Sequence, residues 1–198
     1  MIQSNLSNQF WNYFLALEED VEKVARFIEV NEDNLQVYSI ELARILLSAS
    51  SEVDVLLKQL CLYLDDSKPP KDINAYKKII KEKLPEFINE TVFIYRYGFQ
   101  INPWEDWNNG VNPEWWSSHN NVKHQRHIHF NKANVENVLK AMSGLLICVT
   151  YYYKFKFQKE YKEKKVEIDM NKTCEILNPK SKLFKFKVAY HQHPVYLY

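Results

Sequence analysis

The fold is decided by residues 35–64, which read LQVYSIELARILLSASSEVDVLLKQLCLYL. Apolar side chains recur there at spacings of three and four residues, the pattern of a helix with one broad apolar face. The stretch predicts a long helix packed against other helices, with Asn34 as its N-cap and turn-forming residues 65–70 after its end. The apolar face comprises Tyr38, Leu42, Ile45, Leu46, Ala49, Val53, Leu56, Leu57 and Leu60, and the polar members are Glu41, Arg44, Glu52, Asp54 and Lys58.

Two segments around this stretch carry the same periodicity. Residues 6–30 predict an amphipathic helix in front of it. Behind it, Asp72 or Asn74 is expected to cap a third helix that continues to about Asn89. We expect Pro85 to kink this helix or end it early, because proline lacks the backbone N–H that helix interiors need.

Two further helices are expected in the second half of the chain. Pro113 suits the first turn of a helix over residues 115–125. Asn131 is expected to cap a longer helix over residues 132–161, whose apolar residues again have helical spacing. The chain therefore alternates helices with short polar breaks.

Strand signals are confined to short segments. Residues 91–101 are rich in β-branched and aromatic side chains around Gly98, which predicts a small hairpin. An aromatic loop follows, and four of the five tryptophans of the chain lie between positions 104 and 116. Near the C-terminus, residues 183–188 alternate as a strand does, and residues 194–198 are a second candidate strand.

These elements predict a mainly α protein. We expect residues 1–161 to form a helical bundle with its core in residues 35–155, into which the hairpin and aromatic loop at 91–112 are inserted. Residues 162–198 form a basic C-terminal extension, which we expect to pack on the bundle and to carry the two short strands.

Composition narrows the possible functions. The chain has 198 residues, of which 46% are hydrophobic, so it can bury a sizeable core. With only three glycines, a glycine-rich phosphate loop is excluded. Positive and negative charges are unevenly spread: residues 1–60 hold four Lys/Arg and ten Asp/Glu, and the remainder holds 22 and 15. An acidic front and a basic rear suit either two solvated faces or attraction to a partner, including a second copy of the chain.

The cysteines and the apolar runs favour a cytoplasmic protein with no membrane association. Cys61, Cys148 and Cys174 are odd in number and far apart, and the first two sit in apolar helical segments, so we expect buried thiols in a reducing compartment. We see no signal peptide at the N-terminus. The longest apolar run, residues 145–153, is too short to span a bilayer.

One segment concentrates groups that carry chemistry. Four of the six histidines, at positions 119, 124, 127 and 129, fall within eleven residues, with cations and amides among them. Histidine is the side chain whose charge changes near neutral pH. We expect the functional centre at residues 115–124, and the histidine segment allows three kinds of chemistry.

The first alternative is a zinc site built from histidines, although His119 and His124 are about 140° apart on a helix. The second is cleavage of RNA without a metal, in which histidines act as base and acid. Lys123, Arg126 or the side-chain amide of Asn120 then stabilises the charged phosphorane. The third is a binding groove in which a tryptophan stacks on a base beside the cations. Trp115 and Trp116 are adjacent, so at most one of them is expected to face a ligand, and both in the core is the commoner arrangement.

The same segment resembles a signature of one branch of the HEPN superfamily, the higher-eukaryote and prokaryote nucleotide-binding domains. The resemblance extends over about residues 35–155, and its more specific part is the downstream block. That block comprises Trp115, Trp116, His119, Asn120, Asn121, Val122, Lys123, His124, Phe130, Ala133, Asn134, Asn137, Val138, Leu139, Ala141, Gly144 and Leu145, and the upstream part comprises residues 41–44 and 51–58.

The resemblance implies a helical bundle that is frequently dimeric and occurs in toxin–antitoxin, abortive-infection and CRISPR-linked systems. Many members of that superfamily resemble metal-independent ribonucleases, whose motif is an arginine, a polar residue, several variable residues and a histidine. Carried over, Asn120 matches the polar position and His124 the catalytic histidine. His119 stands where the arginine is expected, and histidine lacks the permanent charge and bidentate fork that grip a phosphate.

The leading hypothesis is a cytoplasmic HEPN-like protein that acts on RNA as a metal-independent endoribonuclease in a defence or stress response. It needs no cofactor or metal, and its expected partners are RNA, a second copy of the chain and an antitoxin or other protein. The alternative is a non-catalytic HEPN-like binding or assembly domain. The expected catalytic residues are His124, Asn120 and His119, the expected substrate-binding residues are Lys123, Arg126 and Trp116, and the expected supporting residues are Glu52, Asp54 and Lys58.

Overall fold

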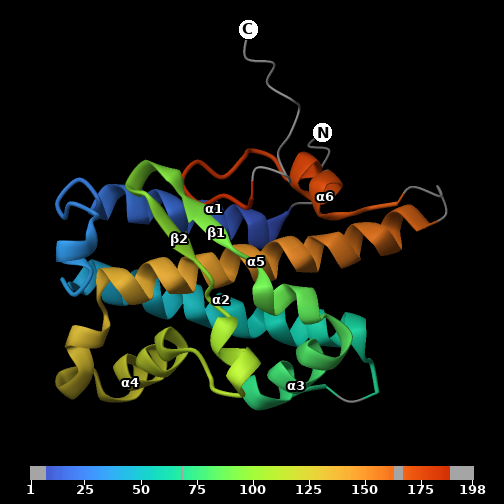
Figure 1. The fold of residues 1–198 in the computed structure, drawn as a ribbon, viewed down its shortest axis with the longest axis horizontal. Helices are drawn as coiled ribbons and strands as arrows, with labels where there is room; N and C mark the ends of the chain where they lie inside the picture. The colour runs from blue at the N-terminus through green and yellow to red at the C-terminus, as the bar shows by residue number, and fades with distance from the viewer. Residues whose placement is uncertain (1–7, 68, 163–166, 188–198) are drawn as a thin grey trace, which may run out of the picture.

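The computed structural model describes residues 8–67, 69–162 and 167–187, and it confirms a mainly α fold with a small β-hairpin. The structure within these ranges consists of α1 (Gln9–Val24), α2 (Ile40–Leu64), α3 (Ile73–Lys83), β1 (Val92–Ile94), β2 (Phe99–Ile101), α4 (Glu114–His129), α5 (Val135–Tyr161) and α6 (Met170–Ile176). In Figure 1, α1, α2 and α5 run along the long axis of the molecule. Helices α3 and α4 lie on one side of them, and the hairpin, α6 and the segment after α6 lie on the other.

The core forms between α2 and α5, the two longest helices. Their apolar faces are buried, and in α2 the buried face from Leu42 to Leu60 is the one that the helical spacing predicts. Tyr38, which was also expected on this face, precedes the helix and is 49% exposed. In α5, burial continues around most of the helix from Val135 to Tyr151, because α1, α4 and α6 also pack on it. Cys61 and Cys148 are both buried in this core, as expected.

The starts of both long helices differ from the prediction. Ser39, and not Asn34, caps α2, and its Oγ accepts a hydrogen bond from the Leu42 N–H at 3.1 Å. Asn134, and not Asn131, caps α5. A tertiary contact explains both differences. Residues 35–38 are not helical because the carbonyls of residues 35 and 37 accept hydrogen bonds from the first backbone N–H groups of α5. This pairing satisfies donors that a helix start leaves free.

The shorter helices largely follow the sequence. Helix α1 ends at Val24, earlier than the expected residue 30. Asp72 caps α3 as predicted, and Pro85 opens a 3₁₀ helix over Pro85–Asn89 in place of further α-helix. The predicted hairpin is confirmed, with Gly98 at φ 73°, a left-handed conformation that favours glycine.

The tryptophan side chains of the aromatic loop lie in the core. Trp104, Trp107 and Trp115 are among the largest fully buried side chains, and the Trp115 indole N–H donates to the Pro103 carbonyl at 2.8 Å. Gly144 of α5 lets these rings approach, because a Cβ there would lie 3.0 Å from Cζ2 of Trp115. The loop therefore supports α4 from within and holds its first turn against α5.

The described part of the C-terminal extension packs on α1 and α5, but the strand expected at 183–188 is wrong in its described part, residues 183–187. Only an isolated bridge forms there, between Phe93 and Lys185. The physical reason is a competing acceptor, because the backbone N–H groups of residues 182–184 donate to the buried Glu18 carboxylate. Helix α6 was not predicted, and the candidate strand at 194–198 lies outside the described residues.

Candidate functional site on helix α4

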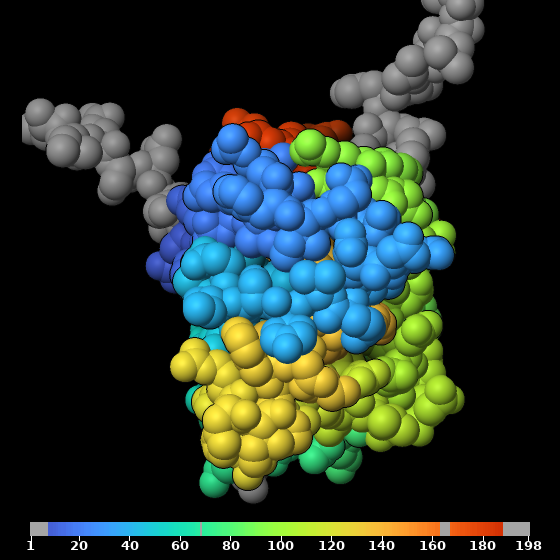
Figure 2. All heavy atoms as spheres, turned by 90° about the vertical axis from the view of Figure 1, so that its left-hand side faces the viewer, coloured from blue at the N-terminus to red at the C-terminus, as the bar shows by residue number. Residues whose placement is uncertain are grey.

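Helix α4 carries the histidine segment along the side of α2. Pro113 is its N-cap, and Trp115, Trp116, Ser118, His119 and Val122 are buried along one face. At Gln125 the backbone leaves helical geometry, with φ −141° and ψ 48°. The regular part of the helix therefore ends at residue 125, as predicted, and the chain changes direction after the kink. Figure 2 shows these yellow residues beside the blue segment that leads from α1 into α2.

A first hollow lies between α4 and α2, and we call it the His119 hollow. Trp116, His119, Asn120 and Lys123 line it from α4, and Leu47, Ser51 and Asp54 line it from α2. Asp54 Oδ1 accepts a hydrogen bond from the Tyr76 hydroxyl of α3 at 3.1 Å, so its carboxylate is already engaged.

His119 is the most perturbed group of the site. Its side chain is 6% exposed, its ring lies 5.5 Å from the Trp116 ring, and its Nδ1 makes no hydrogen bond within the described residues. Burial, with the nearby charges of Lys123 and His124, lowers the pKa of His119 to about 4. The imidazole is therefore neutral at pH 7, and it supplies neither a phosphate-binding charge nor an acidic proton there.

A second hollow, the His124 hollow, opens next to the first. Lys123, His124, Arg126, His127 and Phe130 line it, together with Leu47 and Val122. Its lining contains two permanent cations and two histidines and no carboxylate. Within the described ranges, neither Lys123 nor Arg126 forms an ion pair.

The predicted site residues are thus divided between two adjoining hollows. His119 and Asn120 belong to the first, His124 and Arg126 to the second, and Lys123 lines both. Trp116 is 7% exposed and forms part of the wall of the first hollow, with no open face on which a base could stack.

Of the three expected supporting residues on α2, only Asp54 lines a hollow. Glu52 lies two residues away, about 200° around the helix, and burial alone raises the pKa of its carboxyl. Lys58 is exposed one turn further along α2 and lines neither hollow.

Five lining residues were absent from the predicted site, namely Leu47, Ser51, Val122, His127 and Phe130. His127 and Phe130 line the His124 hollow and follow the kink at Gln125. The sequence around Gln125 contains no proline or glycine from which a kink could have been predicted. On α2, Leu47, Ser51 and Asp54 follow one another at spacings of four and three residues. That spacing marks one helix face and could have identified the surface that receives α4.

The described ranges contain no group of three or more His, Cys, Asp or Glu side chains that could hold a metal ion. No helix in those ranges has both the length and the apolar character needed to cross a membrane.

Comparisons of the chain with protein-family models, curated proteins and solved structures found no match.

The depressed pKa of His119 predicts acid sensitivity of the fold. Between pH 6.5, the ordinary value for histidine, and about 4, the unfolded chain binds a proton that the folded protein does not. The free energy of unfolding is therefore fully retained above pH 6.5 and falls as the pH drops toward 4, by up to about 3 kcal/mol from this group. We expect His119→Gln to lose less stability than the wild type between about pH 7 and about pH 4.5, measured by urea unfolding.

The control for this comparison is His127→Gln, which changes an exposed histidine of the same helix. It should keep the wild-type acid sensitivity. An equal loss of stability in His119→Gln and in the wild type would show that the buried imidazole is not its source.

Proposed function

We propose that the protein is a HEPN-like domain that binds RNA at the His124 hollow and cleaves it as a metal-independent endoribonuclease. The observation that supports this is the lining of the hollow, where two cations and two histidines are exposed and no described carboxylate is among them. Neither cation forms an ion pair with a described residue. A backbone of phosphates is the polyanion that such a surface attracts, and histidines beside it supply proton transfer.

In the proposed reaction, one histidine takes the proton of a ribose 2′-hydroxyl, whose oxygen then attacks the adjacent phosphorus. The bond from phosphorus to the 5′-oxygen breaks, and a second histidine gives that oxygen a proton. The products are a 2′,3′-cyclic phosphate and a 5′-hydroxyl, and Lys123 or Arg126 stabilises the charge on the phosphorane. We assign the two histidine roles to His124 and His127, because both are exposed in the His124 hollow. His119 lines the other hollow and is buried, and its lowered pKa excludes it as the proton donor.

A second candidate function is RNA binding without cleavage. The observation that favours it is His119, which occupies the position of the arginine in the resembled motif and is buried and neutral. In this case the His124 hollow holds phosphates by charge alone, and the protein acts as a binding or assembly domain.

The proposal includes a cytoplasmic role in defence or stress, with a second copy of the chain or an antitoxin-like protein as partner. Exposed apolar side chains near the hollow suit such a contact: Ile128 is 61% exposed on α4, and Tyr38 is 49% exposed and packs edge-on against Phe130. An antitoxin at this surface would cover the RNA site directly.

The test is binding and cleavage of a fluorescently labelled single-stranded RNA in EDTA. We expect the wild type to bind with a strong salt dependence, and the double variant Lys123→Ala/Arg126→Ala to bind about tenfold or more weakly with a salt slope lower by about 1.4. Lys71→Ala/Lys78→Ala removes the same charge from exposed residues near and on α3 and should bind as the wild type does. Binding with cleavage supports the ribonuclease, and binding without it supports the second candidate. No binding contradicts both.

A further inference from the structure

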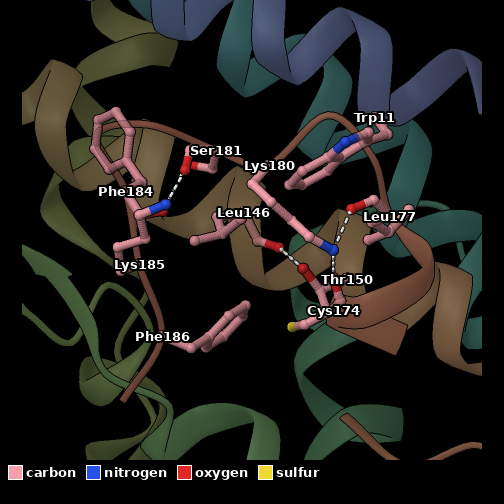
Figure 3. Close-up of a pocket in the computed structure, with 10 residues that line it drawn as sticks. All are labelled: Trp11, Leu146, Thr150, Cys174, Leu177, Lys180, Ser181, Phe184, Lys185 and Phe186. Carbon is pink, nitrogen blue, oxygen red and sulfur yellow. Dashed lines mark hydrogen bonds between the residues drawn. The ribbon is translucent and has the colours of Figure 1, made fainter. Parts of the chain in front are cut away.

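A separate cavity of about 240 Å³ lies on the side of the molecule opposite α4, where the C-terminal segment crosses α1 and α5 (Figure 3). A water molecule occupies about 30 Å³ in the liquid, so this volume holds about eight groups of that size. Its lining comprises Trp11, Leu146, Thr150, Cys174, Leu177, Lys180, Ser181, Phe184, Lys185 and Phe186.

The cavity has an apolar body. The aromatic rings of Trp11, Phe184 and Phe186 and the side chains of Leu146 and Leu177 supply most of its wall. The polar groups of the wall are largely used: the Thr150 hydroxyl donates to the Leu146 carbonyl at 2.8 Å, and Trp11 Nε1 donates to the Pro179 carbonyl at 2.8 Å. Such a wall favours an apolar ligand with few polar atoms.

Two lysines approach this apolar space from opposite sides of Leu146 in Figure 3, and they differ in how their protons are used. The Lys180 ammonium donates to the carbonyls of residues 174, 175 and 177 at the end of α6. An ammonium has three donors, so Lys180 is satisfied and serves as the cap of a helix C-terminus.

Lys185 is different, because within the described residues its ammonium donates to a single acceptor, the Ser181 carbonyl. Two of the three N–H groups of the ammonium therefore have no acceptor among the described residues. Lys185 also forms no ion pair within those residues. Glu18, the acid whose charge acts on Lys185, already accepts four hydrogen bonds from residues 181–184. Burial lowers the pKa of Lys185 although the Glu18 charge acts in the opposite direction, so holding this half-buried ammonium has a cost that Glu18 does not fully offset.

We propose that this cavity binds a small amphipathic monocarboxylate with an apolar body of about eight carbons, whose carboxylate pairs with Lys185. The carboxylate supplies two acceptor oxygens for the two unused N–H directions, and it neutralises the half-buried charge. The chain of the ligand replaces solvent against the rings of Trp11, Phe184 and Phe186. Lys180 stays with the carbonyls of α6, so Lys185 alone selects the head group.

The experiment titrates octanoate and octanol separately into the full-length protein by isothermal calorimetry. We expect octanoate to bind the wild type with a dissociation constant below about 1 mM, and octanol at least about tenfold more weakly, because a charge-assisted hydrogen bond contributes more than that factor. This comparison needs no variant. Equal affinities for the two ligands, or no binding of octanoate up to about 10 mM, would overturn the proposal.

A variant series then assigns the head-group contact. Lys185→Met keeps the length of the side chain without its charge and should weaken octanoate binding about tenfold or more, and Lys185→Arg should retain it. Lys187→Met, an exposed lysine two residues further on, is the matched control and should bind as the wild type does. Unchanged octanoate affinity in Lys185→Met contradicts the assignment to Lys185. Circular dichroism of each variant checks that the fold is intact.

Discussion

Replacing Glu18 by glutamine is expected to lower the free energy of unfolding by about 3 kcal/mol, a large part of the stability of a single domain. The Glu18 carboxylate is 2% exposed and lies against the C-terminal segment. It accepts hydrogen bonds from the Ser181 hydroxyl at 2.5 Å and from the backbone N–H groups of residues 182, 183 and 184 at 3.0, 2.8 and 3.1 Å.

Glutamine has nearly the same shape but a different hydrogen-bonding capacity. Its amide keeps one acceptor oxygen and turns the other position into a donor, which then faces N–H groups that are donors themselves. At least one buried backbone N–H of residues 182–184 is left without an acceptor, and each such loss costs about 1–3 kcal/mol. The loss of the charge removes the attraction of Glu18 for the nearby Lys185 as well.

Urea unfolding followed by tryptophan fluorescence measures this change. Glu19→Gln, at the exposed neighbouring position, makes the same substitution without a buried partner and should change stability by less than about 0.5 kcal/mol. Hydrogen exchange of the Leu183 amide localises the effect and should accelerate in Glu18→Gln. Equal stabilities of the two variants would contradict the role of Glu18 as the anchor of the C-terminal segment.

The contact of Glu18 with the C-terminal segment is an example of a feature of the fold that could not be predicted from the sequence. Helical spacing in residues 35–64 is a local property, and it predicted the course of α2 and the face that it buries. The alternation in residues 183–188 is just as clear, yet a carboxylate more than 160 residues earlier takes the N–H groups that a strand would use. The cap of α2 moved to Ser39 for a similar reason, because the residues before it pair with the start of α5. Long-range hydrogen bonds of this kind leave no periodic trace in the sequence.

In the candidate site, too, the local pattern could be predicted from the sequence and the long-range arrangement could not. The concentration of histidines and cations in α4 was visible in the sequence, and the structure brings His124, Arg126 and Lys123 around one hollow. Which histidine joins them depended on the kink at Gln125 and on the burial of His119 against Trp116, and neither follows from residue spacing. The prediction placed both Glu52 and Asp54 at the site, but only Asp54 lines it. Residues two positions apart on a helix are separated by about 200°, so helical geometry could have excluded one of the pair.

Replacing His124 by alanine is expected to lower the rate of RNA cleavage by about 10²–10⁴-fold, the range that a general acid or base contributes. His124 is exposed at the surface of the His124 hollow, so truncation removes the proposed proton-transfer group without opening the core. RNA affinity should change little, because Lys123 and Arg126 supply the permanent charges there. A loss in rate with unchanged binding separates proton transfer from phosphate binding.

Single-turnover cleavage of a labelled RNA in EDTA, with and without added imidazole, tests this role. Imidazole can enter the open hollow left by the alanine and take over the proton transfer, so the rate of His124→Ala should rise with imidazole concentration and that of the wild type should not. His129→Ala removes a histidine of the same helix that lines neither hollow and should cleave at the wild-type rate. If His124→Ala also cleaved at that rate, proton transfer would have to be assigned to another residue. If the wild type bound RNA and left it intact, the hollow would be a binding site in which His124 transfers no proton.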